Sequence, residues 1–212
     1  SVGYNHFETD GFRVNDDRSD DIVNAFVQGE LSFKTSLQAE YRYRNHDQGD
    51  LQLRFFREDF RPDERQTAET NTYRVGARHS FTPNSILLAS FIHQDLDDTL
   101  KDRPPFPPLN SIDVEGHQHS NGGELQHLFR SRYVNLVNGV GHVDVSGKDR
   151  LTTELDFGDG PFLDVQRSKR GRDHTNVYVY SYLDPLPCLT FTLGGSGDFY
   201  SGDSATEKPN QC

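Results

Sequence analysis

The sequence predicts an all-β chain, folded as an antiparallel up-and-down meander of about nine strands. Three observations support this prediction: a hairpin pattern that recurs along the chain, a low apolar content spread in alternation, and connections that alternate between short and long. Successive side chains of a strand point to opposite faces of its sheet, so alternating apolar and polar residues are typical of a strand with two unlike faces.

The hairpin pattern is clearest between Asn24 and Arg44. Apolar and polar residues alternate over Val23–Leu31 and again over Leu37–Tyr43, and the polar segment SFKTS between them reads as a tight turn. The same unit begins again near Thr72, Gly122 and Asn176, at spacings of 48, 50 and 54 residues. A unit repeated at near-constant spacing indicates that the whole chain is built from one kind of element.

The composition indicates where the apolar residues of these strands lie. Only 33% of the residues are hydrophobic, the mean hydropathy is −0.79 and the net charge is −11, whereas soluble domains carry about 45–50% apolar residues. Disorder would explain these values, but 15 Phe and 9 Tyr in regular alternation argue against it. A barrel with lipid outside and water inside needs only every second strand residue to be apolar. We therefore expect part of a transmembrane β-barrel.

In chain order, Ser1–Arg13 is predicted to be a strand that leads into a polar loop at Val14–Asp20. The hairpins that follow are expected at about 21–46, 70–95, 116–146 and 173–201, all within one partial barrel domain spanning 1–212. Long loops are expected between them, at Gln48–Ala68, Leu96–Glu115 and Ser146–Arg172. The short turns are expected at SFKTS, at TPNS (82–85), at SRY (131–133) and at DPLPC (184–188).

This rhythm of connections indicates how the barrel is oriented. Outer-membrane barrels of bacteria have short periplasmic turns, longer extracellular loops and strands of about ten residues. We therefore assign the short turns to the periplasmic side. The chain has no Met, which favours a processed or excerpted chain. The two cysteines, Cys188 and Cys212, are expected to be unpaired.

The segments NAFVQGEL, TSLQAEYRYR, TYRVGARHSF and FTLGGSGDF resemble barrel strands of TonB-dependent receptor-like outer-membrane proteins. The resemblance covers nearly the whole chain and is a pattern of strands, not a catalytic motif. It implies transport or binding at the outer membrane of a Gram-negative-type bacterium. Neither the plug domain nor the TonB box of active receptors is visible, and single-chain bacterial barrels have even strand numbers. We therefore expect a partial barrel that is completed by other strands of a parent chain.

Charged residues on one set of alternate positions are candidates to line the lumen, where charge tunes selectivity. They are Glu30, Glu40, Arg42, Arg44, Arg74, Arg78, Glu124 and Arg130. The alternative for each is cross-strand pairing inside a wet interior. Residues on the other positions are candidates for the lipid-facing surface and its aromatic girdles, since aromatic rings suit the headgroup level. They are Val27, Ala39, Tyr41, Tyr43, Tyr73, Phe81, Phe91 and Phe129. Their alternative is packing in a soluble sheet.

Other motifs do not support a catalytic or metal site. His117 and His119 share a strand face but supply only two ligands, and a tetrahedral site needs more. The tripeptide at 156–158 matches a kinase metal motif without the accompanying nucleotide loop. The glycines at 194–197 precede no helix, so they hold no phosphate. We expect no catalytic residue, no cofactor and no resident metal.

The predicted function is passage or uptake of a small solute through an outer-membrane barrel that is receptor-like or porin-like and not enzymatic. Its partners would be outer-membrane lipid, the solute and the remaining barrel strands. The net charge of −11 argues against nucleic acid. The alternatives are a structural or surface-adhesion barrel, a soluble β-sandwich binding module and a barrel enzyme acting on lipid or glycan.

Overall fold

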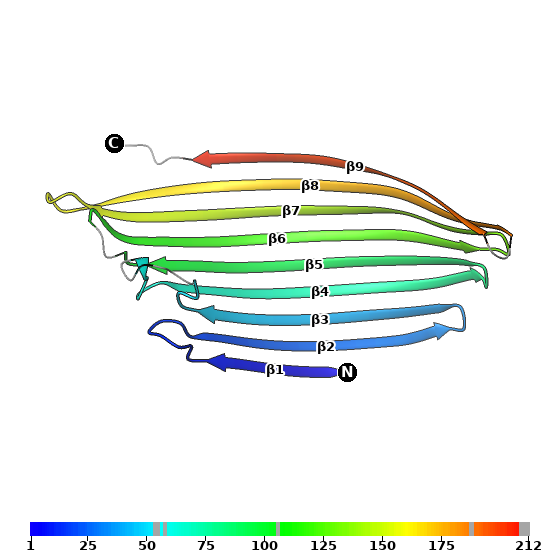
Figure 1. Ribbon diagram of the computed structural model, residues 1–212, viewed down its shortest axis with the longest axis horizontal. Coiled ribbons are helices and arrows are strands. Elements are labelled where there is room, and N and C mark those ends of the chain that lie inside the picture. The colour runs from blue at the N-terminus through cyan, green and yellow to red at the C-terminus, as the bar shows by residue number, and fades with distance from the viewer. Residues whose placement is uncertain (53–55, 57–58, 105–106, 187–188, 208–212) are drawn as a thin grey trace.

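The computed structural model describes residues 1–52, 56, 59–104, 107–186 and 189–207. These residues form a single antiparallel sheet of nine strands in the order β1 to β9, in which each strand pairs with its neighbour in the chain (Figure 1). The predicted all-β meander is therefore confirmed. The strands are β1 (Val2–Thr9), β2 (Arg18–Ser32), β3 (Thr35–Gln48), β4 (Arg65–Thr82), β5 (Ser85–Asp102), β6 (Leu109–Arg130), β7 (Val134–Asp156), β8 (Pro161–Leu186) and β9 (Leu189–Glu207).

Short turns gather at one end of the sheet and longer connections at the other, as Figure 1 shows. Two of the turns are closed by a hydroxyl group. Ser32 Oγ accepts a hydrogen bond from the Lys34 amide at 3.2 Å, and Thr82 Oγ1 accepts one from the Asn84 amide at 3.3 Å. Hydroxyl groups of Ser and Thr commonly bond the backbone two residues further on and so favour turns. The predicted turn at 184–188 begins too early, because β8 extends to Leu186. Its last two residues, 187 and 188, lie outside the described residues.

Two of the predicted long loops are wrong over most of their length. β5 and β6 leave only 103–108 between them, and β7 and β8 leave only 157–160. These segments are rich in charged residues and also contain Pro or Gly, which we interpreted as loop. The polar side chains instead pair across the strands, as Asp97 does with His117 and Asp95 with His119. A strand ladder is held by backbone hydrogen bonds, so polar pairs on one face can extend it. On the other face Leu100, Val114 and Leu151 pair in one row.

The connection between β3 and β4 folds onto the neighbouring loop at the long-loop end. Asp50 is fully buried there. It lies 3.6 Å from Arg13 Nη1 and accepts a hydrogen bond from the Arg61 amide at 3.1 Å. The Arg61 guanidinium also reaches Asp102 at the end of β5, at 2.6 Å. These contacts connect Arg13, Asp50 and Arg61 of the two loops to one another and to the end of β5.

The pairing register gives the sheet two unlike faces. Val27 pairs with Ala39, Ala39 with Val75 and Val75 with Phe91, so these four side chains share one face, which we call the Val27 face. The opposite face, called here the Glu40 face, carries Glu40 and its partner Arg74. Among the described residues no hydrophobic side chain forms a buried core, and the buried charged side chains are all acidic. The sheet therefore has no dry core of its own.

Candidate functional site

All the residues predicted to line a lumen lie on the Glu40 face, and all those predicted to face lipid lie on the Val27 face. The pairs Ser36–Arg78, Arg74–Glu40 and Ser90–Glu124 fix this for β3 to β6. The same alternation places Glu30, Arg42, Arg44 and Arg130 with them. The structure thus brings each predicted set together on one surface, whereas the environment of each surface remains a prediction.

Apolar side chains on the Val27 face form a band that crosses the strands diagonally. The row of paired residues through Ala25 changes from apolar to polar as it crosses the sheet. This row contains Ala25, Tyr41, Tyr73, His93, Asn121 and Asp144. At the short-turn end of the sheet the apolar side chains lie on the later strands. There β7 and β8 carry Leu136 and Leu183, at a level beyond the turn that joins β2 to β3.

The slope of this band gives the angle between the strands and the band. The last apolar residue on the long-loop side is Tyr43 in β3 and Val140 in β7. Through the strand pairing, Tyr43 in β3 lies level with Ser146 in β7. The band edge in β7 is Val140, which lies six residues nearer the short turns than Ser146. At about 3.4 Å per residue and about 4.8 Å between strands, this descent corresponds to a tilt of about 45°.

A second pair of strands gives a similar value. Tyr4 in β1 lies in the row of Gly171, and the band edge in β8 is Val177, again six residues lower. Spread over the wider separation from β1 to β8, the same descent corresponds to about 30°. Strands of membrane barrels tilt by about 35–45°. The slope across β3 to β7 lies at the upper end of this range, and the slope averaged over β1 to β8 lies just below it.

The width of the band also matches a bilayer. In β2 it extends from Val23 to Leu31, which is about 27 Å along the strand and about 21 Å along the normal at a tilt of 40°. The apolar belt of outer-membrane barrels is about 25 Å tall. Tyr43 and Tyr73 lie at its long-loop edge and Phe81 and Phe129 at its short-turn edge. Tyr41 and Tyr73 also contact each other, with ring centroids 5.0 Å apart.

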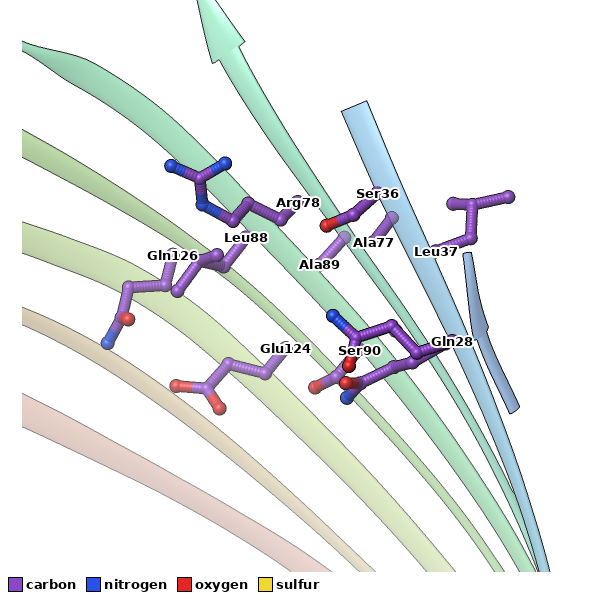
Figure 2. Close-up of a pocket in the computed structure, with 12 residues that line it drawn as sticks. Gln28, Ser36, Leu37, Ala77, Arg78, Leu88, Ala89, Ser90, Glu124 and Gln126 are labelled. Atoms are coloured by element: carbon purple, nitrogen blue, oxygen red, sulfur yellow. The ribbon is translucent and has the colours of Figure 1, made fainter. Parts of the chain in front are cut away.

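On the Glu40 face a polar hollow of about 320 Å³ lies over β2 to β6. Figure 2 shows Arg78, Gln126 and Glu124 on one side of the sheet and Leu37 pointing to the other. Amide and hydroxyl groups predominate among the side chains on this face of the hollow, namely Gln28, Ser36, Gln38, Ser90 and Gln126. Such groups both donate and accept hydrogen bonds.

Glycine and tyrosine residues shape the surroundings of the hollow. A Cβ at Gly76 would come within 2.8 Å of Gln38 Nε2, so this glycine leaves room for the Gln38 side chain. On the far side, Tyr178 Oη donates to Glu124 Oε1 at 2.6 Å and accepts from Gln126 Nε2 at 2.8 Å. The hydroxyl of Tyr178 therefore orients both side chains. The sequence reasoning selected Arg78 and Glu124 here for their charge and placed Gln28 on the same face by alternation, but it did not select Ser90, Gln126 or Tyr178.

A network of ion pairs lies on the same face above the apolar band. Asp20 is buried and accepts hydrogen bonds from Arg44 Nη2 at 2.7 Å and Arg18 Nε at 2.7 Å, while His46 Nδ1 lies 2.9 Å away. Burial raises the pKa of Asp20, but the bonds from Arg44, Arg18 and His46 outweigh it and lower the pKa to about 2. This carboxylate therefore holds three cationic or polar groups in place.

The two histidines of β6 lie together on the Val27 face, as their spacing predicted. The rings of His117 and His119 are 4.6 Å apart at 87°, and they contact Asp97 and Asp95. Within the part of the chain that the structure describes, no group of three or more His, Cys, Asp or Glu side chains could hold a metal ion. Cys188 and Cys212 lie outside the described residues, so their expected unpaired state stays a prediction.

In the described ranges, no helix has the length and apolar character that crossing a membrane requires.

Comparison with known proteins gives matches in structure but not in sequence. A scan against protein-family models finds no match, and a search of curated proteins finds none. The sheet is similar to the ferric yersiniabactin uptake receptor FyuA of Yersinia pestis, with a TM-score of 0.68 and 10% identity over 97% of this chain and 39% of that one. A match to the siderophore receptor PiuA of Acinetobacter baumannii has a TM-score of 0.48 and 10% identity over 92% of this chain and 40% of that one. The chain thus spans about two fifths of each receptor. Its nine-stranded meander has the fold of the matching part of FyuA, in agreement with the predicted resemblance to a partial TonB-dependent receptor-like barrel.

Proposed function

We propose that the chain is part of an outer-membrane barrel of a Gram-negative-type bacterium through which a small solute passes or is taken up. The observation that carries this proposal is the diagonal apolar band on the Val27 face. A soluble sheet has no reason to tilt its apolar surface across the strands, whereas a sheet tilted in a bilayer must do so. In this proposal the Val27 face meets lipid and the Glu40 face lines a wet interior.

The energetics of the two faces agree with this arrangement. Val27 is 66% exposed and Val75 is 51% exposed in the sheet alone. Large apolar patches left in water mark a surface that something else covers. The Glu40 face carries ion pairs such as Arg74–Glu40 at 3.0 Å, and these suit an aqueous interior. Lipid against the Val27 face and water against the Glu40 face therefore suit the side chains of both faces.

The two sheet edges require additional strands. In the described sheet β1 and β9 each pair on one side only, and an unpaired strand edge in hydrocarbon leaves backbone groups without partners. Since the chain covers 39% of FyuA, we infer that strands from a longer parent chain complete the barrel. The 212-residue segment alone would then aggregate or need detergent.

The chemistry of the interior supports a polar solute. The hollow offers amide, hydroxyl, guanidinium and carboxylate groups, which can form hydrogen bonds with a polar molecule. FyuA is named as an uptake receptor for ferric yersiniabactin, which supports uptake of a small molecule here. We infer a non-enzymatic role with no cofactor.

The proposal is tested in cells that produce the full-length parent protein. Outer-membrane fractions should contain it, and its gel mobility in detergent should change on heating. Uptake of iron bound to a panel of siderophores should fall for at least one of them when the gene is deleted, or the purified protein should conduct KCl in planar bilayers. A parent protein that stays in the aqueous phase without detergent contradicts the membrane proposal. Membrane location with neither uptake nor conductance contradicts the transport proposal.

A further inference from the structure

Two polar residues interrupt the apolar band on the Val27 face of β6 and β7. His127 pairs directly with Asn138 across these strands. Their neighbours on the same face, along and across the strands, are apolar. These neighbours are Leu87, Leu125, Phe129, Leu136, Val140 and Val179. Polar side chains placed within the hydrocarbon of a membrane are costly, so they indicate a functional contact.

The chain itself satisfies these two side chains only in part. His127 Nε2 lies 2.9 Å from Ser85 Oγ, which occupies one nitrogen of the imidazole ring. The side chain of Asn138 forms no hydrogen bond with any residue that the structure describes. A carboxamide has two N–H donors and an acceptor oxygen, and leaving them unpaired in an apolar medium costs free energy. We therefore expect a partner that both donates and accepts hydrogen bonds at Asn138.

A groove beside Asn138 leaves room for such a partner. Its volume is about 760 Å³, and it extends over β8 to Gly195 and Gly197 of β9. A Cβ added at Gly195 would meet no atom within 4 Å, so the backbone of β9 is open to contact there. Val177 and Phe199, which also line the groove, are exposed. Glycine in a strand commonly marks a place where another chain approaches closely.

The polar groups of this surface lie at nearly the same depth in the proposed membrane. At a strand tilt of 40°, His127 lies about 3 Å deeper than Asn138, because it is one strand away in the same row. Ser181 of β8 lies two residues beyond Val179, the pairing partner of Asn138, and is about 2 Å deeper. His127 and Ser181 are thus at one level, on opposite sides of Asn138.

We propose that this surface, the Val27 face of β5 to β9 within the apolar band, docks a second copy of the parent protein. The inference rests on the proposed membrane location. A two-fold axis along the membrane normal, the usual symmetry of a dimer, keeps every residue at its own depth. Asn138 therefore meets Asn138 of the partner subunit, and two carboxamides can exchange two hydrogen bonds. The same axis brings His127 of one copy toward Ser181 of the partner subunit.

The area of the proposed surface is sufficient for a dimer. Five strands at about 4.8 Å spacing and about 27 Å of strand length give roughly 650 Å² per copy, or about 1,300 Å² in total. Specific interfaces bury about 1,200–2,000 Å². Lipid chains would cover the apolar part of this surface equally well, but they offer no hydrogen bond to Asn138. This difference favours a second copy as the occupant.

The first experiment measures dimerisation of the purified full-length parent protein in detergent by sedimentation equilibrium. G195W fills the groove, and G29W is the matched control, because a Cβ at Gly29 in the band of β2 also meets no atom within 4 Å. G195W should be monomeric, whereas G29W should dimerise like the parent. N138L removes the carboxamide pair and should weaken dimerisation about tenfold, at about threefold for each of two hydrogen bonds.

The second experiment uses isolated outer membranes and therefore needs no detergent. Single cysteines are introduced as N138C or A39C into a parent protein whose other cysteines are replaced by serine. Because Asn138 is placed beside the two-fold axis, oxidation of N138C should give a covalent dimer on a denaturing gel. A39C lies in the apolar band of β3 on the same face and should remain monomeric.

The outcomes separate this inference from the proposed function. A parent protein that is monomeric in both experiments overturns the dimer. A dimer that tolerates both G195W and N138L, or equal cross-linking of N138C and A39C, overturns this surface as the interface. A cross-link from N138C to a different protein overturns the second copy as the occupant. A parent protein that stays in the aqueous phase without detergent contradicts the membrane location, and this is observed before any association is measured.

Discussion

Arg74 and Glu40 face each other across the β3–β4 ladder, with Arg74 Nη1 3.0 Å from Glu40 Oε2. One residue along each strand, Tyr41 and Tyr73 contact each other on the opposite face. One step along the strand thus exchanges an ion pair for an aromatic pair. In this pair of strands the alternation thus separates a charged surface from an apolar one.

The ion pair itself is expected to contribute little to stability. The Arg74 side chain is 48% exposed and that of Glu40 is 31% exposed, and exposed pairs contribute about 0.2–1 kcal/mol. A double-mutant cycle with Arg74→Met and Glu40→Gln should give a coupling free energy within that range. Thermal unfolding of the full-length parent in detergent measures it. A coupling of several kcal/mol would mean that water does not reach this face.

Basic substitutions should distinguish the two faces by stability. Val27→Arg or Ala39→Arg is expected to cost about 2–4 kcal/mol, because both positions lie near the middle of the band and hence near the bilayer midplane. Gln28→Arg and Glu40→Arg are the matched controls on the Glu40 face and should cost much less. Folding of each variant into lipid vesicles, followed by the heat-dependent shift in gel mobility, gives the comparison. Similar costs at all four positions would contradict the assignment of the faces.

Single cysteines at the same positions report water access directly. A water-soluble thiol reagent should label positions 28 and 40 in the assembled parent barrel and spare 27 and 39. Labels placed at these sites should be quenched by a lipid-soluble quencher in the opposite order. Because a shift of one residue would reverse every side chain, the four positions also test the register. Equal aqueous labelling at all four would show that these strands are not in a membrane.

The buried carboxylate of Asp20 predicts a loss of stability in acid. Its pKa is lowered from 3.8 in the unfolded chain to about 2 in the sheet, so the ionised form stabilises the fold above pH 4, by about 2 kcal/mol. This contribution is expected to disappear as the pH falls through 2. Asp20→Asn should be less stable than the parent at pH 6 and should lose less on acidification. Thermal unfolding at both pH values measures this, and parallel pH dependence of the two proteins would contradict it.

The sequence was sufficient for the strands and their faces but not for their lengths. Alternation within Val23–Leu31 and Leu37–Tyr43 predicted both faces correctly, because one strand carries the whole pattern. The upper parts of β5 to β8 were missed because their many charged residues and prolines were interpreted as loop, and pairing such as Asp97–His117 reveals them as strand. The tilt of the apolar band was also hidden, since it exists only in the register between strands.

The candidate hollow was predicted only in part for a related reason. Arg78 and Glu124 were selected because they are charged. Gln38 and Gln126 carry no charge, and Tyr178 suits either face, so the sequence offered no way to prefer them. The hydrogen bonds from Tyr178 to Glu124 and from Gln126 to Tyr178 link strands β6 and β8, which are not adjacent, and no sequence pattern records such a contact.

The unequal strand lengths have a consequence for access to the proposed interior. Above the apolar band, β2 continues only from Val23 back to Arg18, whereas β7 continues from His142 to Asp156. At a tilt of 40° these segments rise about 13 Å and about 36 Å. The strands therefore build a rim that is low beside β1 to β3 and tall beside β6 to β8. A large ligand such as an antibody or a phage fibre would be blocked sterically by β6 to β8. It is therefore expected to approach over β1 to β3, obliquely to the membrane.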